Sequence, residues 1–217
     1  MQPFLIIKKK GAVNMLFNRS DIRNPSRVSG YRLDMAVKKM KAENGLEGLG
    51  VCFQRMEEKY SINSIILLSI AILESGYGLS KLAKEKNNLF GLDANDSYKG
   101  TENYGGKYKS KEDSIEAAAF RIAKQYLEID VSCPWRYIMG KTDLDSVGKK
   151  WCSNPEWANK VNRIAENIND IVGLEIERDD REEVWNEIEK TFLDLKNLSN
   201  ELNEKIDNNY DNLKRFF

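Results

Sequence analysis

The sequence predicts a mainly helical domain followed by one long C-terminal helix. Apolar residues recur at helical spacing in several segments between positions 31 and 174. A stretch rich in Gly, Asn and Tyr, residues 87–109, interrupts this pattern and indicates a small loop or hairpin lobe. Residues 1–30 carry Pro and Gly without a sustained period, so we interpret them as an N-terminal arm. We therefore expect an arm, a domain over 31–174 and a helix over 175–217.

Most of the helices predicted within the domain are ordinary amphipathic segments. Ser110 with Asp113 has the pattern of a capping box at the start of one helix. Asn154-Pro155 has the pattern of an N-cap residue followed by proline at the first position of another. The spacing of apolar residues, with a short helix before the loop lobe, places these helices at 33–40, 51–56, 79–86, 115–126 and 157–172.

One helix differs from the others because it is apolar on every side. Residues 65–73 are all apolar except Ser69, and such a helix belongs in a core. Glu74 follows directly, and Ser75-Gly76-Tyr77-Gly78 is expected to end the helix there. Glu74 is therefore predicted at the C-terminal end of a buried helix.

The tail has a coiled-coil pattern, because ten of its positions alternate in steps of three and four. Eight of the ten residues are apolar, and the two polar ones favour one register. We favour a helix that oligomerises or binds a partner through 178–217, and the alternative is a single amphipathic helix folded back on the domain. The ten residues are Trp185, Ile188, Phe192, Leu195, Ser199, Leu202, Ile206, Asn209, Leu213 and Phe216.

The composition excludes several kinds of enzyme. The chain contains no histidine, so cysteine–histidine and serine–histidine–acid machinery and histidine-based zinc sites cannot be assembled from it. Cys52, Cys133 and Cys152 are too widely spaced for a metal site, and we expect ordinary thiols there. Glycosidases remain, because carboxyl groups alone can carry out their chemistry. No metal or cofactor is expected.

The charge is balanced overall but unevenly distributed. Of the 34 basic and 34 acidic residues, 7 and 13 lie in 175–217, so the tail carries a net charge of −6 and the rest +6. A mildly basic body suits an anionic polymer such as a bacterial wall, but it lacks the concentrated basic patch of a nucleic-acid-binding protein. No segment has the length for membrane insertion.

Glu74 is the carboxyl group best suited to act as a general acid. Burial disfavours its ionised form, and the negative end of the helix dipole acts in the same direction. A carboxyl group that stays protonated near neutral pH can protonate a leaving oxygen. The loop that follows is rich in aromatic residues, whose rings can pack on sugars. They are Tyr77, Phe90, Tyr98, Tyr104 and Tyr108.

Several motifs, in order, resemble the β-N-acetylglucosaminidases of glycoside hydrolase family 73. The resemblance covers residues from about 30 to 173. Its most specific part joins Ala-Ile-Leu-Glu-Ser-Gly-Tyr-Gly, residues 71–78, to Asn-Asn-Leu-Phe-Gly, residues 87–91. Further similar stretches are Gly48-Leu49-Gly50, Tyr60-Ser-Ile-Asn63, Tyr108-Lys-Ser110 and Ser153-Asn-Pro-Glu-Trp-Ala158.

The resemblance implies a lysozyme-like fold and hydrolysis of the β-1,4 bond after N-acetylglucosamine in peptidoglycan. The general acid of the family corresponds to Glu74. Many members carry tyrosine where this chain has Trp151, an indole that can stack on a sugar but donates only an N–H. We expect Trp151, together with Asn88 and Trp157 of the matched stretches, to bind substrate.

The resemblance leaves the second catalytic group open. Family members often carry another acid in the loop lobe, and Asp93, Asp96 and Glu102 are candidates here. We favour Glu102 because Thr101-Glu102-Asn103-Tyr104 is similar to a stretch in some members. The N-acetyl group of the substrate is an alternative nucleophile.

Two alternatives remain for the function: a muramidase or lytic transglycosylase on the same fold, and an inactive wall-binding or structural module. Residues 1–10 place a short apolar run before the lysines, the reverse of a signal peptide. We therefore expect a protein that is cytoplasmic until it is released or carried in a virion, as a phage lysin would be. The tail would then bind a second copy or a structural partner in the virion, and a bacterial autolysin is the remaining setting.

Overall fold

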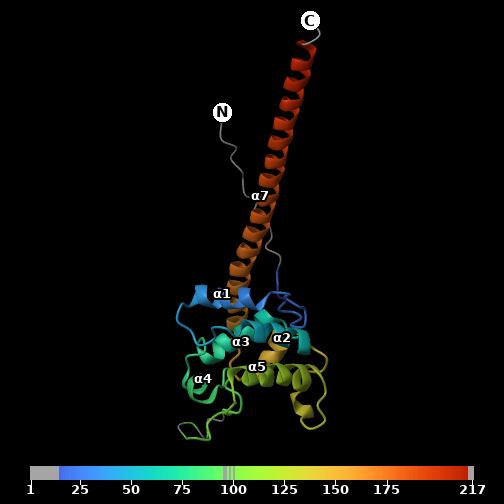
Figure 1. The fold of residues 1–217 in the computed structure, drawn as a ribbon. Coiled ribbons are helices and arrows are strands. Elements are labelled where there is room, and N and C mark those ends of the chain that lie inside the picture. The colour runs from blue at the N-terminus through green and yellow to red at the C-terminus, as the bar shows by residue number, and fades with distance from the viewer. Residues whose placement is uncertain (1–14, 95–96, 98, 100, 215–217) are drawn as a thin grey trace. The chain divides into compact units, whose positions relative to one another are not determined.

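The computed structural model describes residues 15–94, 97, 99 and 101–214, with the backbone alone for 204 and 207–214. These residues form helices and loops without a strand, so the mainly helical class is confirmed. The chain divides between Gly173 and Leu174 into two compact units. Figure 1 shows the helices α1 (Gly30–Met40), α2 (Gly50–Tyr60), α3 (Ser64–Ser75), α4 (Lys81–Lys86), α5 (Lys111–Phe120), η2 (Arg121–Leu127), η3 (Pro134–Arg136), α6 (Leu144–Trp151) and α7 (Trp157–Lys214).

Helix α3 lies in the core of the first unit. Its residues from Ser64 to Ile72 are all buried, as the unbroken apolar run predicts. Asn63 caps the N-terminal end by accepting hydrogen bonds from the amides of Ile65 and Ile66. Helix α2 packs against α1, α3 and α5. The buried helix therefore gives Glu74, in its last turn, a fixed position.

Residues 15–29 are part of this core, which corrects their interpretation as an arm. Phe17, Ile22 and Val28 are buried. The Ile22 amide donates to the Thr142 carbonyl at 2.9 Å, and the Asn63 amide donates to the Ile22 carbonyl at 2.8 Å. Because these contacts come from distant segments, the segment shows no period of its own. Residues 1–14 lie outside the described chain.

The second half of the unit departs from the predicted helices in two places. Helix α5 begins with the predicted capping box of Ser110 and Asp113, but continues as the π-helix η2. Helix α6, which was not predicted, has Asp143 as its N-cap. Helix α7 begins at Trp157, two residues later than the Asn154-Pro155 pattern suggested.

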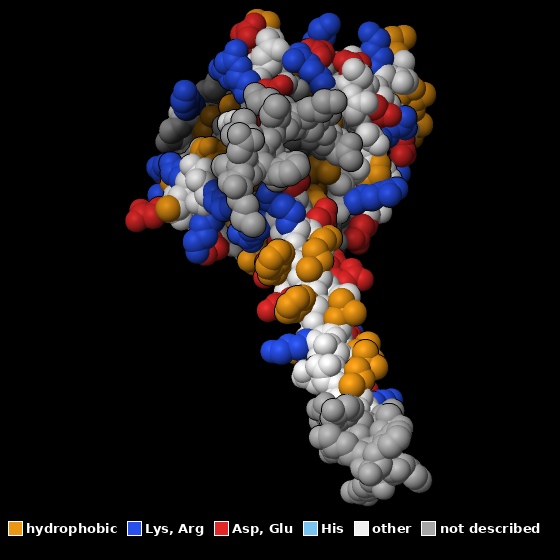
Figure 2. All heavy atoms as spheres, turned by 90° about the horizontal axis from the view of Figure 1, so that it is seen from above, with side chains coloured by type: hydrophobic (Ala, Val, Ile, Leu, Met, Phe, Trp, Pro, Cys, Tyr) orange, Lys and Arg blue, Asp and Glu red, His pale blue; other side chains and the backbone are white. Residues whose placement is uncertain are grey.

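The second unit is the tail of α7 from Leu174 onward. Between 184 and 206 its large apolar side chains are more than half exposed, and Figure 2 shows hydrophobic side chains along the visible face of this segment. Six are the expected seam residues from Trp185 to Ile206, and Ser199 is exposed as well. The side chains of Asn209 and Leu213, and all of Phe216, lie outside the described residues. Within the described chain, no helix is both long and apolar enough to cross a membrane.

Candidate active site

Glu74 lies at the C-terminal end of α3, where the backbone turns sharply. Gly76 caps the helix with φ +57°, a left-handed conformation that costs glycine little. The Ser75 hydroxyl donates to the Ala71 carbonyl at 2.5 Å and accepts from the Gly78 amide at 2.7 Å. Because Ser75 fastens the turn to the helix, the preceding carboxyl group projects from a rigid element.

Two tryptophans bind the same oxygen of Glu74. Trp157, at the start of α7, donates its indole N–H to Glu74 Oε1 at 2.7 Å, and Trp151, at the end of α6, donates to the same atom at 3.1 Å. The two indole rings are stacked, with centroids 5.9 Å apart and an interplanar angle of 26°. Trp157 is 3% exposed. It therefore holds the carboxyl group from inside, which corrects its assignment as a substrate-binding residue.

The surroundings of Glu74 favour its protonated form. Burial raises the pKa of its carboxyl group above the usual 4.5, and the two indole N–H groups oppose part of that rise because they stabilise the ionised form. The negative end of the α3 dipole acts in the same direction as burial. Glu74 thus has the electrostatic setting that the sequence predicts for a general acid.

The loop after α4 approaches Glu74 from another side. Asn88, 1% exposed, donates to the carbonyls of Leu92 and Gly106 and accepts from the amides of Phe90 and Leu92. It therefore shapes the loop, which corrects its assignment as a substrate-binding residue. Gly91 has φ +61°, and a Cβ there would lie 3.9 Å from Glu74 Oε2. The loop thus brings bare backbone next to the second oxygen of Glu74.

A cavity of about 450 Å³ lies beside this loop, and Trp151 links it to Glu74. The ring of Trp151 meets Phe90 and Tyr126 edge to face, each at a centroid distance of 6.3 Å. Phe90 is only 1% exposed, so it supports this wall from the core, although it was expected to bind substrate. The cavity is lined by Phe90, Gly91, Leu92, Asp93, Ala94, Arg121, Tyr126, Arg136 and Trp151.

Asp93 is the acid that lines this cavity, next to the loop residue Gly91. Its carboxylate forms an ion pair with Arg121 at 2.9 Å. Glu102, the acid favoured from the sequence, lines a different cavity of about 870 Å³. The sequence favoured Glu102 on a local similarity, whereas the fold of the loop places Asp93 in the cavity that Trp151 also lines. Asp96 lies outside the described residues.

Of the four remaining tyrosines predicted to bind sugar, the three that the structure describes lie in different surroundings. The hydroxyl of Tyr108 and the carboxylate of Asp93 both approach Gly106, so Tyr108 stands close to the Asp93 cavity, and burial raises the pKa of its phenol. Tyr104 lines the other cavity together with Glu102. The ring of Tyr77 stacks under the ammonium group of Lys41 at 5.3 Å. Tyr98 lies outside the described residues.

Three residues of the cavity were not singled out from the sequence as site residues. Tyr126 was interpreted as one position of a buried helical stripe, and Arg121 and Arg136 carried no motif. All three come from η2 or η3, and η2 lies in the part of the helix that departs from α-helical geometry. The polar residues Arg121, Gln125 and Arg136 could have indicated a site here. Their spacing along the chain has no pattern, however, and becomes meaningful only once the chain is folded.

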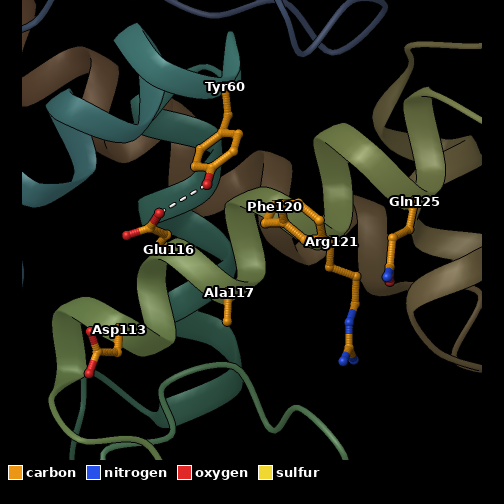
Figure 3. Close-up of a pocket in the computed structure, with 7 residues that line it drawn as sticks. All are labelled: Tyr60, Asp113, Glu116, Ala117, Phe120, Arg121 and Gln125. Carbon is orange, nitrogen blue, oxygen red and sulfur yellow. Dashed lines mark hydrogen bonds between the residues drawn. The ribbon is translucent and has the colours of Figure 1, made fainter. Parts of the chain in front are cut away.

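A third cavity, shown in Figure 3, is not suited to hold a general acid. It has a volume of about 390 Å³ and lies over α5 and η2. Its Glu116 accepts hydrogen bonds from Lys59 at 2.5 Å and from the Tyr60 hydroxyl at 3.0 Å. The bond from Lys59 is the main cause that lowers the pKa of Glu116. That carboxylate is held ionised, so it is unsuited to donate a proton.

The described residues show no group of three or more Cys, Asp or Glu side chains that could hold a metal ion. The three cysteines are free, and Cys52 and Cys133 are buried.

Comparison with known proteins places the chain among glucosaminidases. The model of the family described as mannosyl-glycoprotein endo-beta-N-acetylglucosaminidase matches residues 51–170, more than half of the chain. Two relatives from strains of Streptococcus pneumoniae, each named "Putative endo-beta-N-acetylglucosaminidase", are 30% identical over 159 residues. The match covers 70% of this chain but only 22% and 21% of theirs, so the chain spans about a fifth of the length of these curated relatives.

A solved structure supports the fold. The crystal structure of S. aureus autolysin E in complex with the muropeptide NAM-L-Ala-D-iGlu is 24% identical and has a TM-score of 0.50. The similarity covers 71% of this chain and 72% of that one. The family match shows that the chain belongs to the glucosaminidase family, glycoside hydrolase family 73.

Proposed function

We propose that this protein hydrolyses peptidoglycan at the β-1,4 bond between N-acetylglucosamine and N-acetylmuramic acid, with Glu74 as the general acid. The observation that carries the proposal is the setting of Glu74 in a member of a glucosaminidase family. Its carboxyl group is partly buried, its pKa is raised by that burial, and one of its oxygens faces the loop that borders a cavity. A protonated carboxyl group in such a place can protonate a glycosidic oxygen.

Asp93 is the second catalytic group that we propose. A second carboxyl group in a cavity beside the acid can activate water or act as the nucleophile. The ion pair with Arg121 holds the Asp93 side chain in one orientation. The N-acetyl group of the substrate is the alternative nucleophile, and in that case Asp93 would only orient or stabilise it.

Trp151, Tyr126 and Tyr108 are the aromatic residues that we propose for sugar binding. Trp151 and Tyr126 line the cavity, and Tyr108 lies beside Asp93 at its edge. Sugar rings have apolar faces that pack on aromatic rings, and the phenols add hydrogen-bonding groups. Tyr104 and Tyr77 are not included, because Tyr104 lines the other cavity and the ring of Tyr77 contacts Lys41.

The central test compares dye release from labelled cell walls by the wild-type protein and by Glu74→Gln. We expect release from the wild type and a loss of roughly 10²–10⁴-fold in the variant, the range contributed by a general acid. Glu102→Gln, which changes an exposed acid on the other cavity, is the matched control and should stay close to wild type. Equal release by wild type and Glu74→Gln, or none from either, would contradict the proposal and favour an inactive binding module.

The bond that is cleaved is tested by the sugar ends of the products. Mass spectrometry should find reducing N-acetylglucosamine after digestion. A reducing N-acetylmuramic acid end would identify a muramidase, and an anhydro end would identify a lytic transglycosylase on the same fold.

We also propose that the tail of α7 associates with the same segment of other copies of this chain. An isolated helix with large apolar residues more than half exposed gains little from packing on its own. In a parallel, in-register pair, Glu189 would face Val184 of the second copy, and Lys196 would face Thr191, so no like charges oppose each other at these flanking positions. The alternative occupant is a structural protein of a virion, which would make the chain a virion-associated lysin.

The mass of the full chain in solution tests the association. We expect an oligomer for the wild type and a monomer for Phe192→Glu, because that change puts a charge into the apolar seam. Leu193→Glu is the matched control, since Leu193 is also exposed but lies outside the seam positions. A monomeric wild type at tens of micromolar, or equal effects of the two variants, would contradict self-association.

A further inference from the structure

The two bonds from tryptophan to Glu74 end on one atom. Trp157 and Trp151 both donate to Oε1, at 2.7 and 3.1 Å. An indole N–H can only donate, so each bond needs a lone pair of the carboxyl oxygen. A carboxyl oxygen has about two acceptor sites, and the two indoles occupy both. When Glu74 is protonated, its proton therefore has no favourable place on Oε1.

The other oxygen is open. No donor among the described residues reaches Oε2, and no side-chain oxygen or nitrogen of these residues is fully buried without a partner. Oε2 therefore has surface that water or a substrate can reach. It points toward Gly91, where a Cβ would lie 3.9 Å away, and Gly91 lines the cavity that also contains Asp93. A hydroxyl group on Oε2 would face the side from which a glycan can approach.

We propose that Trp151 and Trp157 are positioning residues that fix the acidic proton of Glu74 on Oε2, the oxygen facing Gly91 and the cavity. This inference rests on the proposed role of Glu74 as the general acid. When the proton leaves Oε2 for the glycosidic oxygen, the O–H bond breaks and the carboxyl group becomes a carboxylate. Negative charge then grows on Oε1, and the two indole bonds strengthen at that moment. The same pair thus selects the donating oxygen and stabilises the charge that donation leaves behind.

The charged and titratable groups nearby do not replace this pair. Asp93, Arg121, Arg136 and Tyr126 line the adjacent cavity, and Asp93 and Arg121 are paired with each other. Besides burial, the two indole bonds are the causes that set the pKa of Glu74. Loss of one bond should therefore raise the pKa of Glu74 further, because a donor that favours the ionised form has been removed.

The test is the pH dependence of kcat/KM and the separate values of kcat and KM for Trp157→Phe and Trp151→Phe. Phe keeps an aromatic ring but removes the N–H. We expect kcat to fall roughly tenfold in Trp157→Phe with KM nearly unchanged, since the bond strengthens mainly in the transition state. The alkaline limb of the profile should move to higher pH. Trp151→Phe should also lower kcat and move the alkaline limb to higher pH, but by less, because the hydrogen bond from Trp151 to Glu74 is longer.

Two further variants separate positioning from packing. Trp151→Tyr supplies an O–H donor, so its kcat should lie closer to wild type than that of Trp151→Phe. Trp135→Phe is the matched control, because Trp135 is 68% exposed and donates no hydrogen bond to Glu74; it should leave the profile unchanged. An unshifted alkaline limb in both Phe variants would overturn the inference, and so would a kcat of Trp151→Tyr no higher than that of Trp151→Phe. In either case the proposed function still stands if the wild type is active and Glu74→Gln is inactive. Wild-type activity in Glu74→Gln would instead overturn the proposed function.

Discussion

The two ends of helix α3 hold two carboxyl groups in opposite settings. At the N-terminal end, Glu57 is 8% exposed and accepts from the amide of Ser64 at 2.7 Å and from those of Ser26 and Arg27 at 2.9 Å. Both of its oxygens are occupied by backbone donors. At the C-terminal end, Glu74 has two donors on Oε1, while Oε2 faces the Gly91 loop.

The comparison shows that burial alone does not identify a general acid. Glu57 lies at the N-terminal end of α3 and accepts from three backbone N–H groups, so neither of its oxygens is left open. That side chain ties the segment before α1 to α2 and α3, so its role is structural. Glu74 meets the negative end of the α3 dipole and keeps one oxygen open, so it can hold a proton and release it.

The largest expected effect is a division of roles between two matched substitutions. Glu74→Gln should remove roughly 10²–10⁴-fold of the activity and leave the fold intact, because it removes the proton donor. Glu57→Gln should keep wild-type activity per folded molecule. Wall hydrolysis normalised to the folded fraction, measured by circular dichroism, checks both. Similar losses in the two variants would break the distinction between the two ends.

The second carboxyl pair sharpens the account within the site. Asp93→Asn should lower kcat by at least about tenfold, since it removes the carboxyl group proposed to act with Glu74. Glu102→Gln should change kcat little, because Glu102 lines the other cavity. Steady-state kinetics on a soluble glycan fragment measures both. The reverse ranking would restore Glu102 as the second acid.

Stability should respond most at the other end of α3. A glutamine side chain at position 57 offers one accepting oxygen, so at least one of the three backbone amides would lose its partner. We expect Glu57→Gln to lower the free energy of unfolding by about 1–3 kcal/mol, the cost of an unsatisfied buried donor. Chemical denaturation in urea measures it. An unchanged midpoint would show that the amides find other partners.

The smallest effect is a dependence of stability on pH. Because burial raises the pKa of Glu74, the native state keeps its proton above pH 4.5, where the unfolded chain releases its own. The wild-type free energy of unfolding therefore falls as pH rises through this window, and Glu74→Gln lacks that fall. The stability of the variant minus that of the wild type should increase between about pH 4 and about pH 7. A constant difference would argue against a raised pKa.

The sequence predicted those parts of the molecule that depend on local patterns. The apolar run at 65–73 placed α3 in the core, and the residue after it became the proposed acid. The capping box of Ser110 and Asp113 was also confirmed. These features are readable because helical periodicity, caps and glycine stops act over a few neighbouring residues.

The features that the sequence did not reveal depend on contacts between distant segments. Trp151 and Trp157 reach Glu74 from 77 and 83 positions away, so their shared bond to one oxygen has no local signature. Asp93 reaches the cavity beside Trp151 only after the loop has folded around Asn88. Phe17, Ile22 and Val28 are buried by their partners and not by a period of their own.

The most direct test of the account is the titration of Glu74 itself. The carboxyl ¹³C resonance of Glu74 can be assigned by its absence in Glu74→Gln and then followed against pH. The account predicts a midpoint above the ordinary 4.5 of a glutamate, because burial at the end of α3 outweighs the two indole bonds. A midpoint at or below 4.5 would contradict the claim that this carboxyl group holds its proton for catalysis.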